Sequence, residues 1–234
     1  MWQAGRRDRG SAALGLMKED IIRASFAAFL SGRGYAARTD FTVPGTNILI
    51  DIAAVQPRMR DLKARLKRGF VPTGLLHHLI GAGWVSLGQI IHQTGYEPGY
   101  VTAILEEAAA EHWVEIEHGK GESHCRILDY RPPAKECLLA FVGTEMLLER
   151  IERLKELAGC YNRALFLFPY PVDEKTTEQI VQVGAGVVRY HQEHGVFQQL
   201  IPAESFDIED PGRFALIVEY ILYENVWIQM EDII

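Results

Sequence analysis

Turn-forming residues between Ser86 and Pro98 constrain the fold more than any other feature of this sequence. Serine commonly caps the N-terminus of a helix, and a glycine such as Gly95 often ends one in a left-handed turn. Pro98 suits the first position of a second helix, because that position needs no backbone donor. The apolar positions of the two predicted helices are Leu87, Ile90, Ile91, Val101, Ile104, Leu105 and Ala108. This stretch therefore predicts two helices joined by a tight turn.

The residues on either side extend that pattern. Another short helix is predicted before Ser86, in the sequence TGLLHHLIGAGW. After the second helix, apolar and acidic residues alternate from Trp113 to Glu117, and GKGES turns the chain back toward Cys125 and Leu128. Three short helices followed by a hairpin predict a winged helix-turn-helix over residues 72–131.

The flanking residues mix helical and strand patterns. The predicted helices are 18–31, 58–68, 145–157 and 176–194, and the predicted strands are 35–43, 47–55, 137–142, 164–168 and 197–201. Residues 214–224 fit either a closing helix or a buried strand. We therefore expect an α/β fold with an inserted winged helix. The expected division is a flexible tail at 1–16, an α/β domain at 17–71 and 132–234, and a winged helix-turn-helix domain at 72–131.

Composition excludes several classes of protein. Of 234 residues, 48% are apolar, but no apolar run approaches the roughly 20 residues needed to span a bilayer, so no membrane partner is expected. Cys125, Cys137 and Cys160 are too widely spaced for a disulfide framework or a metal knuckle, and the cytoplasm is the expected location. The net charge of −7 argues against a surface that is basic throughout.

Two acidic residues accompany the second and third predicted strands of the flanking residues. Asp51 lies in ILIDIAAV, and Glu136 begins ECLLAFV. The order of elements around them resembles the restriction-endonuclease-like fold of the PD-(D/E)xK nucleases and Holliday-junction resolvases. In that family, an acid on the second strand and a Glu-x-Lys on the third hold a divalent metal and orient water. The resemblance implies a nuclease-like, mixed-sheet α/β domain over about the outer two-thirds of the chain.

The catalytic motif of that family is incomplete in this sequence. Asp51 matches the first element, but Leu138 stands where the lysine after Glu136 belongs. Lys135 or Lys155 could supply an amine from a neighbouring position. We therefore expect a catalytically degenerate domain without a metal or cofactor, in which Asp51 is a polar residue at a strand end. The alternative is a DNA endonuclease that uses Mg²⁺ or Mn²⁺ with Asp51, Glu136 and Lys135 or Lys155.

The overall plan is also similar to archaeal proteins that interact with the TATA-binding protein. Those proteins join a resolvase-like domain to a helix-turn-helix part in an acidic chain of comparable size. The similarity implies a protein partner from the transcription machinery.

Charge is distributed unevenly along the chain. Residues 72–131 contain three basic and eight acidic residues, and this net charge of −5 has the wrong sign for an independent DNA reader. Residues 58–68 are strongly basic and contain one acid, Asp61. The candidate nucleic-acid contacts are Arg58, Arg60, Lys63, Arg65, Lys67, Arg68, Tyr100, Thr102 and Lys120. Alternatively, the basic face pairs with the acidic region of a second copy, and a homodimer is expected.

Other motifs carry weaker signals. His118 and His124 flank the predicted wing turn beside Cys125, but a full set of metal ligands is missing, so no metal site is predicted. The glycines of VGAGVV, at residues 183–188, lack the preceding strand and basic residue of a phosphate loop, and close helix packing is expected there. The expected function is a nucleic-acid-associated or transcription-related interaction protein.

Overall fold

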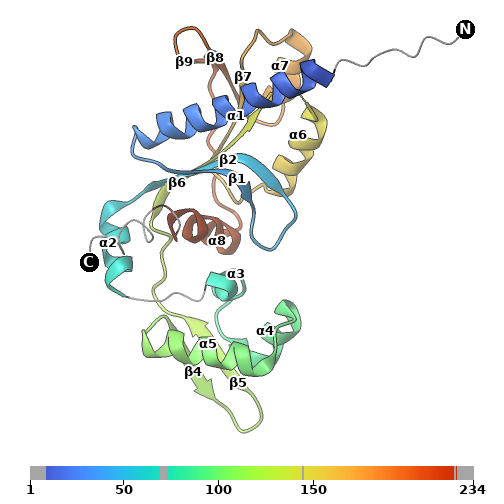
Figure 1. Ribbon diagram of the computed structural model, residues 1–234. Helices are drawn as coiled ribbons and strands as arrows, with labels where there is room; N and C mark the ends of the chain where they lie inside the picture. Colours follow the sequence, from blue (N-terminus) through green and yellow to red (C-terminus); the bar gives the residue numbers. More distant parts are fainter. Residues whose placement is uncertain (1–8, 69–72, 144, 224, 226–234) are drawn as a thin grey trace, which may run out of the picture.

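The computed structural model describes residues 9–68, 73–143, 145–223 and 225. Its larger sheet has six strands in the order β1-β2-β6-β7-β8-β9 (Figure 1). The strands are β1 (Ala36–Thr42), β2 (Leu49–Pro57), β6 (Ala134–Val142), β7 (Arg163–Phe168), β8 (Gly186–His191) and β9 (Val196–Ile201). Strands β6, β7 and β8 run parallel, and the other neighbours are antiparallel. The chain is therefore an α/β protein with a mixed sheet.

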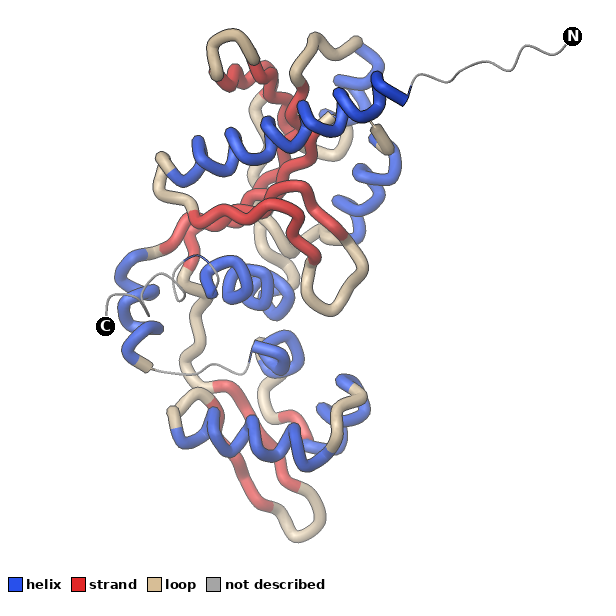
Figure 2. The backbone as a smooth tube through the Cα atoms, in the orientation of Figure 1, coloured by secondary structure: helices blue, strands red, loops and turns tan. Residues whose placement is uncertain are grey.

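Helices cover both faces of this sheet (Figure 2). On one face, α1 (Arg9–Ser31) packs Phe26 and Leu30 into a cluster with Leu138 and Ala140 of β6. The other face packs against α6 (Leu147–Glu156), α7 (Glu174–Val181) and α8 (Pro211–Leu222). Strand β6 is buried on both faces, which explains why its sequence is a continuous apolar run.

A smaller three-stranded sheet is inserted in the sequence between β2 and β6. Its elements are η1 (Thr73–Leu75), α3 (Leu76–Leu79), β3 (Val85–Ser86), α4 (Leu87–Thr94), α5 (Pro98–Ala110), β4 (Val114–His118) and β5 (Ser123–Ile127). The strand order is β3-β5-β4, and an apolar cluster that includes Ile90 and Trp113 forms a separate core. Ser86 accepts a hydrogen bond from the Gln89 N–H, and Gly95 has a φ of 67°. The predicted cap and turn are therefore confirmed. We call residues 73–130 the small unit.

Helices α8 and α2 (Met59–Lys67) connect the small unit to the larger sheet (Figure 1). Gly212 of α8 is buried against α3, where a Cβ atom would come within 2.8 Å of the His77 carbonyl oxygen. A side chain at position 212 would therefore push the two helices apart.

Helix α1 begins earlier than the sequence predicts. It starts at Arg9, so residues 9–16 belong to a helix and not to the expected tail, whereas residues 1–8 lie outside the described part. The run AALGLM is rich in good helix formers, which explains the extension. No helix in the described ranges is long and apolar enough to cross a membrane.

The helix predicted at 176–194 is confirmed only as far as Val181, and the rest of that prediction is wrong. Helix α7 ends at Val181, Gly184 has a φ of 69°, and strand β8 follows. Gly184 therefore forms a turn and Gly186 begins a strand, so neither glycine packs one helix against another. A Cβ at Gly186 would lie 2.6 Å from the Ala203 nitrogen, so a larger residue does not fit there. The choice left open for 214–224 is settled in favour of a helix, α8, over the residues described there.

Candidate functional site

Asp51 lies where strands β2 and β6 separate. The ladder between these strands ends at Ile52 and Ala140, and beyond it Asp51 Oδ2 accepts a 2.7 Å hydrogen bond from the Val142 N–H. The side chain thus satisfies a donor that a backbone carbonyl would otherwise pair in the ladder. Its carboxylate also lies 3.3 Å from an Arg150 nitrogen and 3.7 Å from an Arg23 nitrogen. Both oxygens of this buried carboxylate are therefore engaged by protein groups.

Glu19 of α1 lies beside the same cluster. Its carboxylate occupies the space that a Cβ atom would fill at Gly143, whose φ is +85°. Burial raises the pKa of Glu19, and the positive charge of Arg150 partly opposes that rise. Glu19, Arg23, Asp51 and Arg150 therefore form an ion cluster that ties α1, β2 and α6 together, and we call it the Asp51 cluster.

Glu136 lies at the opposite end of β6. It pairs with Gln56 in the ladder, five residues along β2 from Asp51, which corresponds to about 16 Å. Glu136 Oε1 accepts a hydrogen bond from the Tyr35 hydroxyl at 3.1 Å and lies 3.7 Å from Arg163 Nε. The structure does not bring Asp51 and Glu136 together, so this pair cannot hold one metal ion.

The lysines considered for the nuclease site are also separate from Asp51. Lys135 is exposed at the start of β6, next to Glu136, and Lys155 Nζ lies 2.7 Å from Glu152 on α6. Among the described side chains, no group of three or more His, Cys, Asp or Glu residues is placed to hold a metal ion.

Two arginines of the basic segment are used inside the protein. Arg65 is only 8% exposed, and its guanidinium lies 3.2 and 3.3 Å from the two oxygens of Glu219 in α8. Tyr130 also donates a 2.8 Å hydrogen bond to Glu219. Burial and the negative charge of Glu219 hold the pKa of Tyr130 well above its usual value.

Arg68 extends this contact into the small unit. Its guanidinium carbon lies 3.7 Å from the centre of the Trp113 ring, and that of Arg65 lies 5.1 Å from it. Arg68 also donates hydrogen bonds to the carbonyl oxygens of His112 and Leu128. We call Arg65, Arg68, Trp113, Tyr130 and Glu219 the Glu219 cluster. Arg65 and Arg68 therefore contact protein groups and do not share the exposed face of α2, because packing against the small unit buries the other face of the helix.

The other basic residues of α2 remain exposed. Arg60, Lys63 and Lys67 share one face of the helix, because positions i, i+3 and i+7 lie nearly in line. Arg58 is also exposed and lies 3.9 Å from Asp61. We call Arg60, Lys63 and Lys67 the basic stripe.

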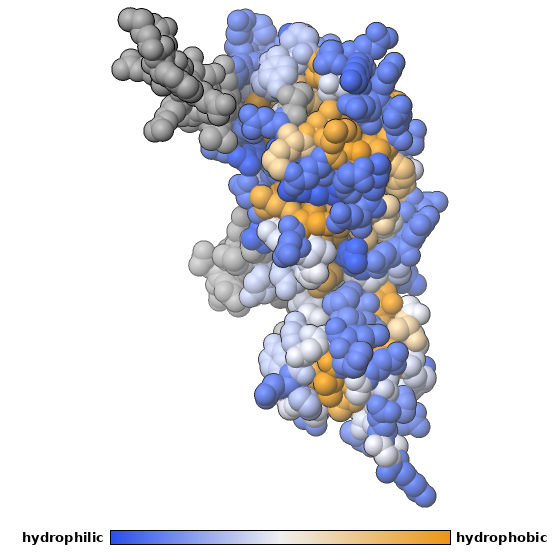
Figure 3. Space-filling view, turned by 90° about the vertical axis from the view of Figure 1, so that its right-hand side faces the viewer, coloured by the Kyte–Doolittle hydropathy of each residue, from blue (hydrophilic) through white to orange (hydrophobic). Residues whose placement is uncertain are grey.

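The contact residues predicted in the small unit lie on different parts of its surface. Tyr100 is 57% exposed, and its ring meets the Tyr96 ring edge to face at 5.6 Å. The Thr102 hydroxyl donates to the Pro98 carbonyl within α5, and Lys120 is exposed in the turn between β4 and β5. Helix α5 itself contains two glutamates and no lysine or arginine. In the view of Figure 3, this unit forms the lower lobe, with an apolar patch among hydrophilic side chains.

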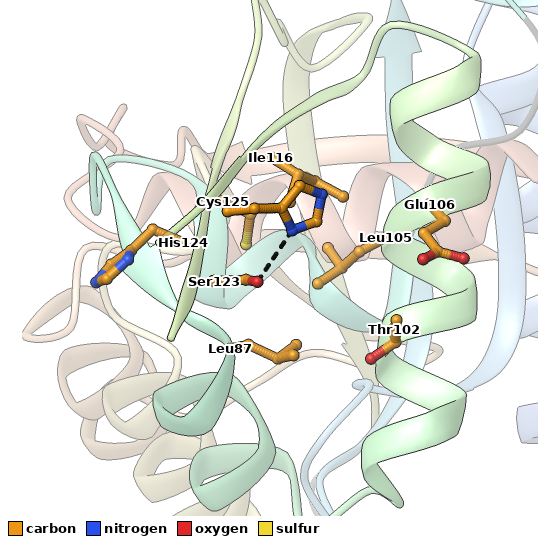
Figure 4. Close-up of a pocket in the computed structure, with 9 residues that line it drawn as sticks. Leu87, Thr102, Leu105, Glu106, Ile116, Ser123, His124 and Cys125 are labelled. Carbon is orange, nitrogen blue, oxygen red and sulfur yellow. Dashed lines mark hydrogen bonds between the residues drawn. The ribbon is translucent and has the colours of Figure 1, made fainter. Parts of the chain in front are cut away.

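A small cavity of about 40 Å³ lies between α5 and the hairpin of the small unit, lined by Leu105 and Ile116 among others (Figure 4). His118 Nδ1 lies 3.1 Å from Ser123 Oγ at its rim. His118 pairs with Ser123 across the hairpin, so the adjacent His124 points to the opposite face of the sheet. Burial raises the pKa of the Cys125 thiol to about 11. The hairpin therefore does not direct the two imidazoles toward a common ion.

The Glu219 cluster is the feature that sequence reasoning missed. Its signal was a single acid in the apolar run LIVEYIL, because a carboxylate surrounded by buried residues requires a partner. The chain matches no protein-family model and no curated protein.

Proposed function

We propose that this chain is a non-enzymatic, nucleic-acid-associated interaction protein of a transcription-related kind. In this proposal, the larger sheet and its helices are a nuclease-like domain, and residues 72–131 are an inserted winged helix-turn-helix. The strand order β3-β5-β4 and the succession α3, α4, α5 and hairpin support the winged helix. The order α1, β1, β2, β6, α6 and β7 supports the nuclease-like assignment.

The observation that carries the proposal is the basic stripe on α2. Arg60, Lys63 and Lys67 keep their charged groups in solvent, whereas Arg65 and Arg68 fix the helix from the opposite side. A rigid row of cations is suited to the phosphates of a nucleic-acid backbone, because neutralising phosphates releases bound counterions. The stripe positions a backbone and does not read bases.

The small unit supports a second, protein-binding surface. Tyr96 and Tyr100 are exposed next to each other at the start of α5, and tyrosines are enriched at the centres of protein interfaces. The acids of α5, Glu106 and Glu107, disfavour contact with phosphates. This surface therefore suits a partner from the transcription machinery or the basic stripe of a second copy, as in a homodimer.

The enzyme alternative receives less support. A divalent-metal endonuclease needs carboxylates that converge on one ion, and Asp51 is instead held by two arginines and a backbone N–H. Its nearest expected partner, Glu136, lies about 16 Å away along β6.

Binding to labelled duplex, junction and single-stranded DNA over a salt series tests the proposal, with Mg²⁺ or Mn²⁺ present so that cleavage is visible on the same gel. We expect salt-sensitive binding that is lost in R60A/K63A/K67A. The matched control is K135A/K155A/K175A, which removes three exposed lysines outside α2 and should bind normally. Absence of binding by the unaltered chain, or equal loss in both variants, would refute the role of the basic stripe. Metal-dependent cutting that disappears in D51A would establish the enzyme alternative instead.

A further inference from the structure

A cavity of about 290 Å³ opens where the parallel strands β7 and β8 end. Pro169, directly after β7, forms one side, and the residues from Arg189 to His194 form the other as the chain turns from β8 into β9. The β8–β9 turn lies at the top of the molecule in Figure 1, far from the small unit. The carboxyl ends of parallel strands are a frequent place for ligands in open α/β sheets, because the loops there leave a crevice.

Arg189 is the unusual residue in this cavity. It is half-buried in β8, where it pairs with Phe168 of β7 and Gln198 of β9. Its Nε atom is fully buried and has no hydrogen-bond partner among the residues that the structure describes. An unpaired buried cationic nitrogen is costly. Because Nε itself is closed off from the cavity, a ligand oxygen would have to bind the terminal nitrogens of the same guanidinium and so compensate its charge.

The other arginines in the interior of the protein differ from Arg189 in having carboxylate partners. Arg23, Arg65 and Arg150 each lie within 4.0 Å of a carboxylate. Glu193 also lines the cavity of Arg189, yet within the described ranges it makes no ion pair with that arginine. Arg189 therefore lines this cavity without a carboxylate partner among the described residues.

Two histidines add further nitrogen atoms to the lining. His191 Nε2 lies 2.9 Å from Gln198 Oε1, which fixes its ring, and His194 is exposed in the turn. A guanidinium presents parallel N–H donors that match two oxygens of a phosphate or carboxylate, and the exposed imidazole of His194 can add a single donor beside it. This combination is suited to an oxyanion and not to a metal cation.

We propose that this cavity binds the oxyanion group of a small ligand, with the two terminal nitrogens of Arg189 as the bidentate contact and His191 and His194 at the mouth. A phosphate group fits best, because it accepts donors from several directions, while a carboxylate shares the same chemistry. The cavity is larger than one phosphate group, so the ligand is a small phosphorylated molecule. The inference does not depend on the proposed nucleic-acid function.

Calorimetric titration of the full chain with inorganic phosphate, and separately with acetate at the same ionic strength, tests this proposal. We expect millimolar or tighter binding of phosphate, weakened about tenfold or more in R189Q because charged hydrogen bonds are lost. R189K keeps the charge without the planar fork, so its affinity should lie in between. R131Q removes an exposed arginine elsewhere and should bind as the unaltered chain does.

Each outcome decides for or against the site. Tighter binding of acetate than of phosphate, with the same loss in R189Q, supports the cavity and assigns it to carboxylate ligands. No binding of either anion, or equal affinity in R189Q and the unaltered chain, overturns the proposal. If circular dichroism shows that R189Q does not fold, R189K and H194Q decide, since His194 is exposed and its replacement leaves the core intact. Unchanged phosphate affinity in both of those variants would also overturn it.

Discussion

The Asp51 cluster and the Glu219 cluster both place a buried carboxylate against arginine, but they stabilise different parts of the molecule. The partners of Asp51 come from α1, α6 and β6, and one of them is a backbone N–H. The partners of Glu219 come from α2 and from Tyr130, shortly after the small unit's sheet, and within the described ranges all of them are side chains. Asp51 therefore holds one layered domain together, whereas Glu219 joins two units. The comparison teaches that a buried carboxylate in this chain is a structural connector.

Replacing Glu219 with alanine should have the largest effect on stability. The change leaves Arg65 buried without its counter-charge and removes the acceptor of Tyr130. Breaking a buried ion pair in this way costs about 3–5 kcal/mol. Urea unfolding followed by tryptophan fluorescence measures the loss, and Trp113 reports directly on this cluster. A loss no larger than that of the exposed control E193A would contradict the connecting role of Glu219.

Replacing Asp51 with alanine should lower the free energy of unfolding by about 2–4 kcal/mol, somewhat less than the loss in E219A. The effect is smaller because Arg23 keeps a second carboxylate, Asp40, at 2.8 Å. D51N should retain part of the stability, since an amide oxygen still accepts from the Val142 N–H. Thermal and urea unfolding of the two variants supply the comparison. If D51A were as stable as the unaltered chain, the carboxylate would be free for a function other than structure.

The two faces of α2 provide an internal contrast of smaller size. R68A should lower the free energy of unfolding by about 1–2 kcal/mol, because it removes the stacking on Trp113 and hydrogen bonds to two carbonyl oxygens. R60A, on the exposed face, should stay within about 0.5 kcal/mol of the unaltered chain. Equal losses in the same unfolding experiment would remove the distinction between buried and exposed faces.

The sequence predicted local structure well where a residue type has one strong preference. Ser86, Gly95 and Pro98 placed the caps of α4 and α5, because each acts within its own turn of chain. It failed at Gly184, where a helical pattern continued through a left-handed turn into β8. That choice depends on pairing with β7 and β9, and such pairing is not visible in a local window.

The candidate site was less predictable than the fold. Arg60 and Arg65 look alike in a run of charges, and only the packing of α2 against Glu219 separates them. Asp51 and Glu136 both lie at strand ends, but whether two strand ends meet depends on strand direction and register. Long-range packing therefore decides which charges are available for binding.

Glu19 should make the stability of the fold depend slightly on pH. Burial raises the pKa of Glu19 in the folded protein above its ordinary value, so the folded state binds this proton more tightly than the unfolded state. The contribution of this group is then largest at acidic pH and is lost as the pH rises through the raised folded pKa. E19Q should remove that part of the slope, as measured by urea unfolding between acidic and neutral pH. A steeper fall of stability with rising pH in E19Q would show that the sign is wrong.

The salt dependence of DNA binding tests the central claim most directly. Three phosphates contacted by the basic stripe predict a slope of about −2.7 for the logarithm of the binding constant against the logarithm of salt concentration. R60A/K63A/K67A should reduce that slope to near zero, while D51N should leave it unchanged if folding is intact. A slope that is unaffected by the triple variant, or lost in D51N, would contradict an account in which α2 binds and Asp51 only stabilises.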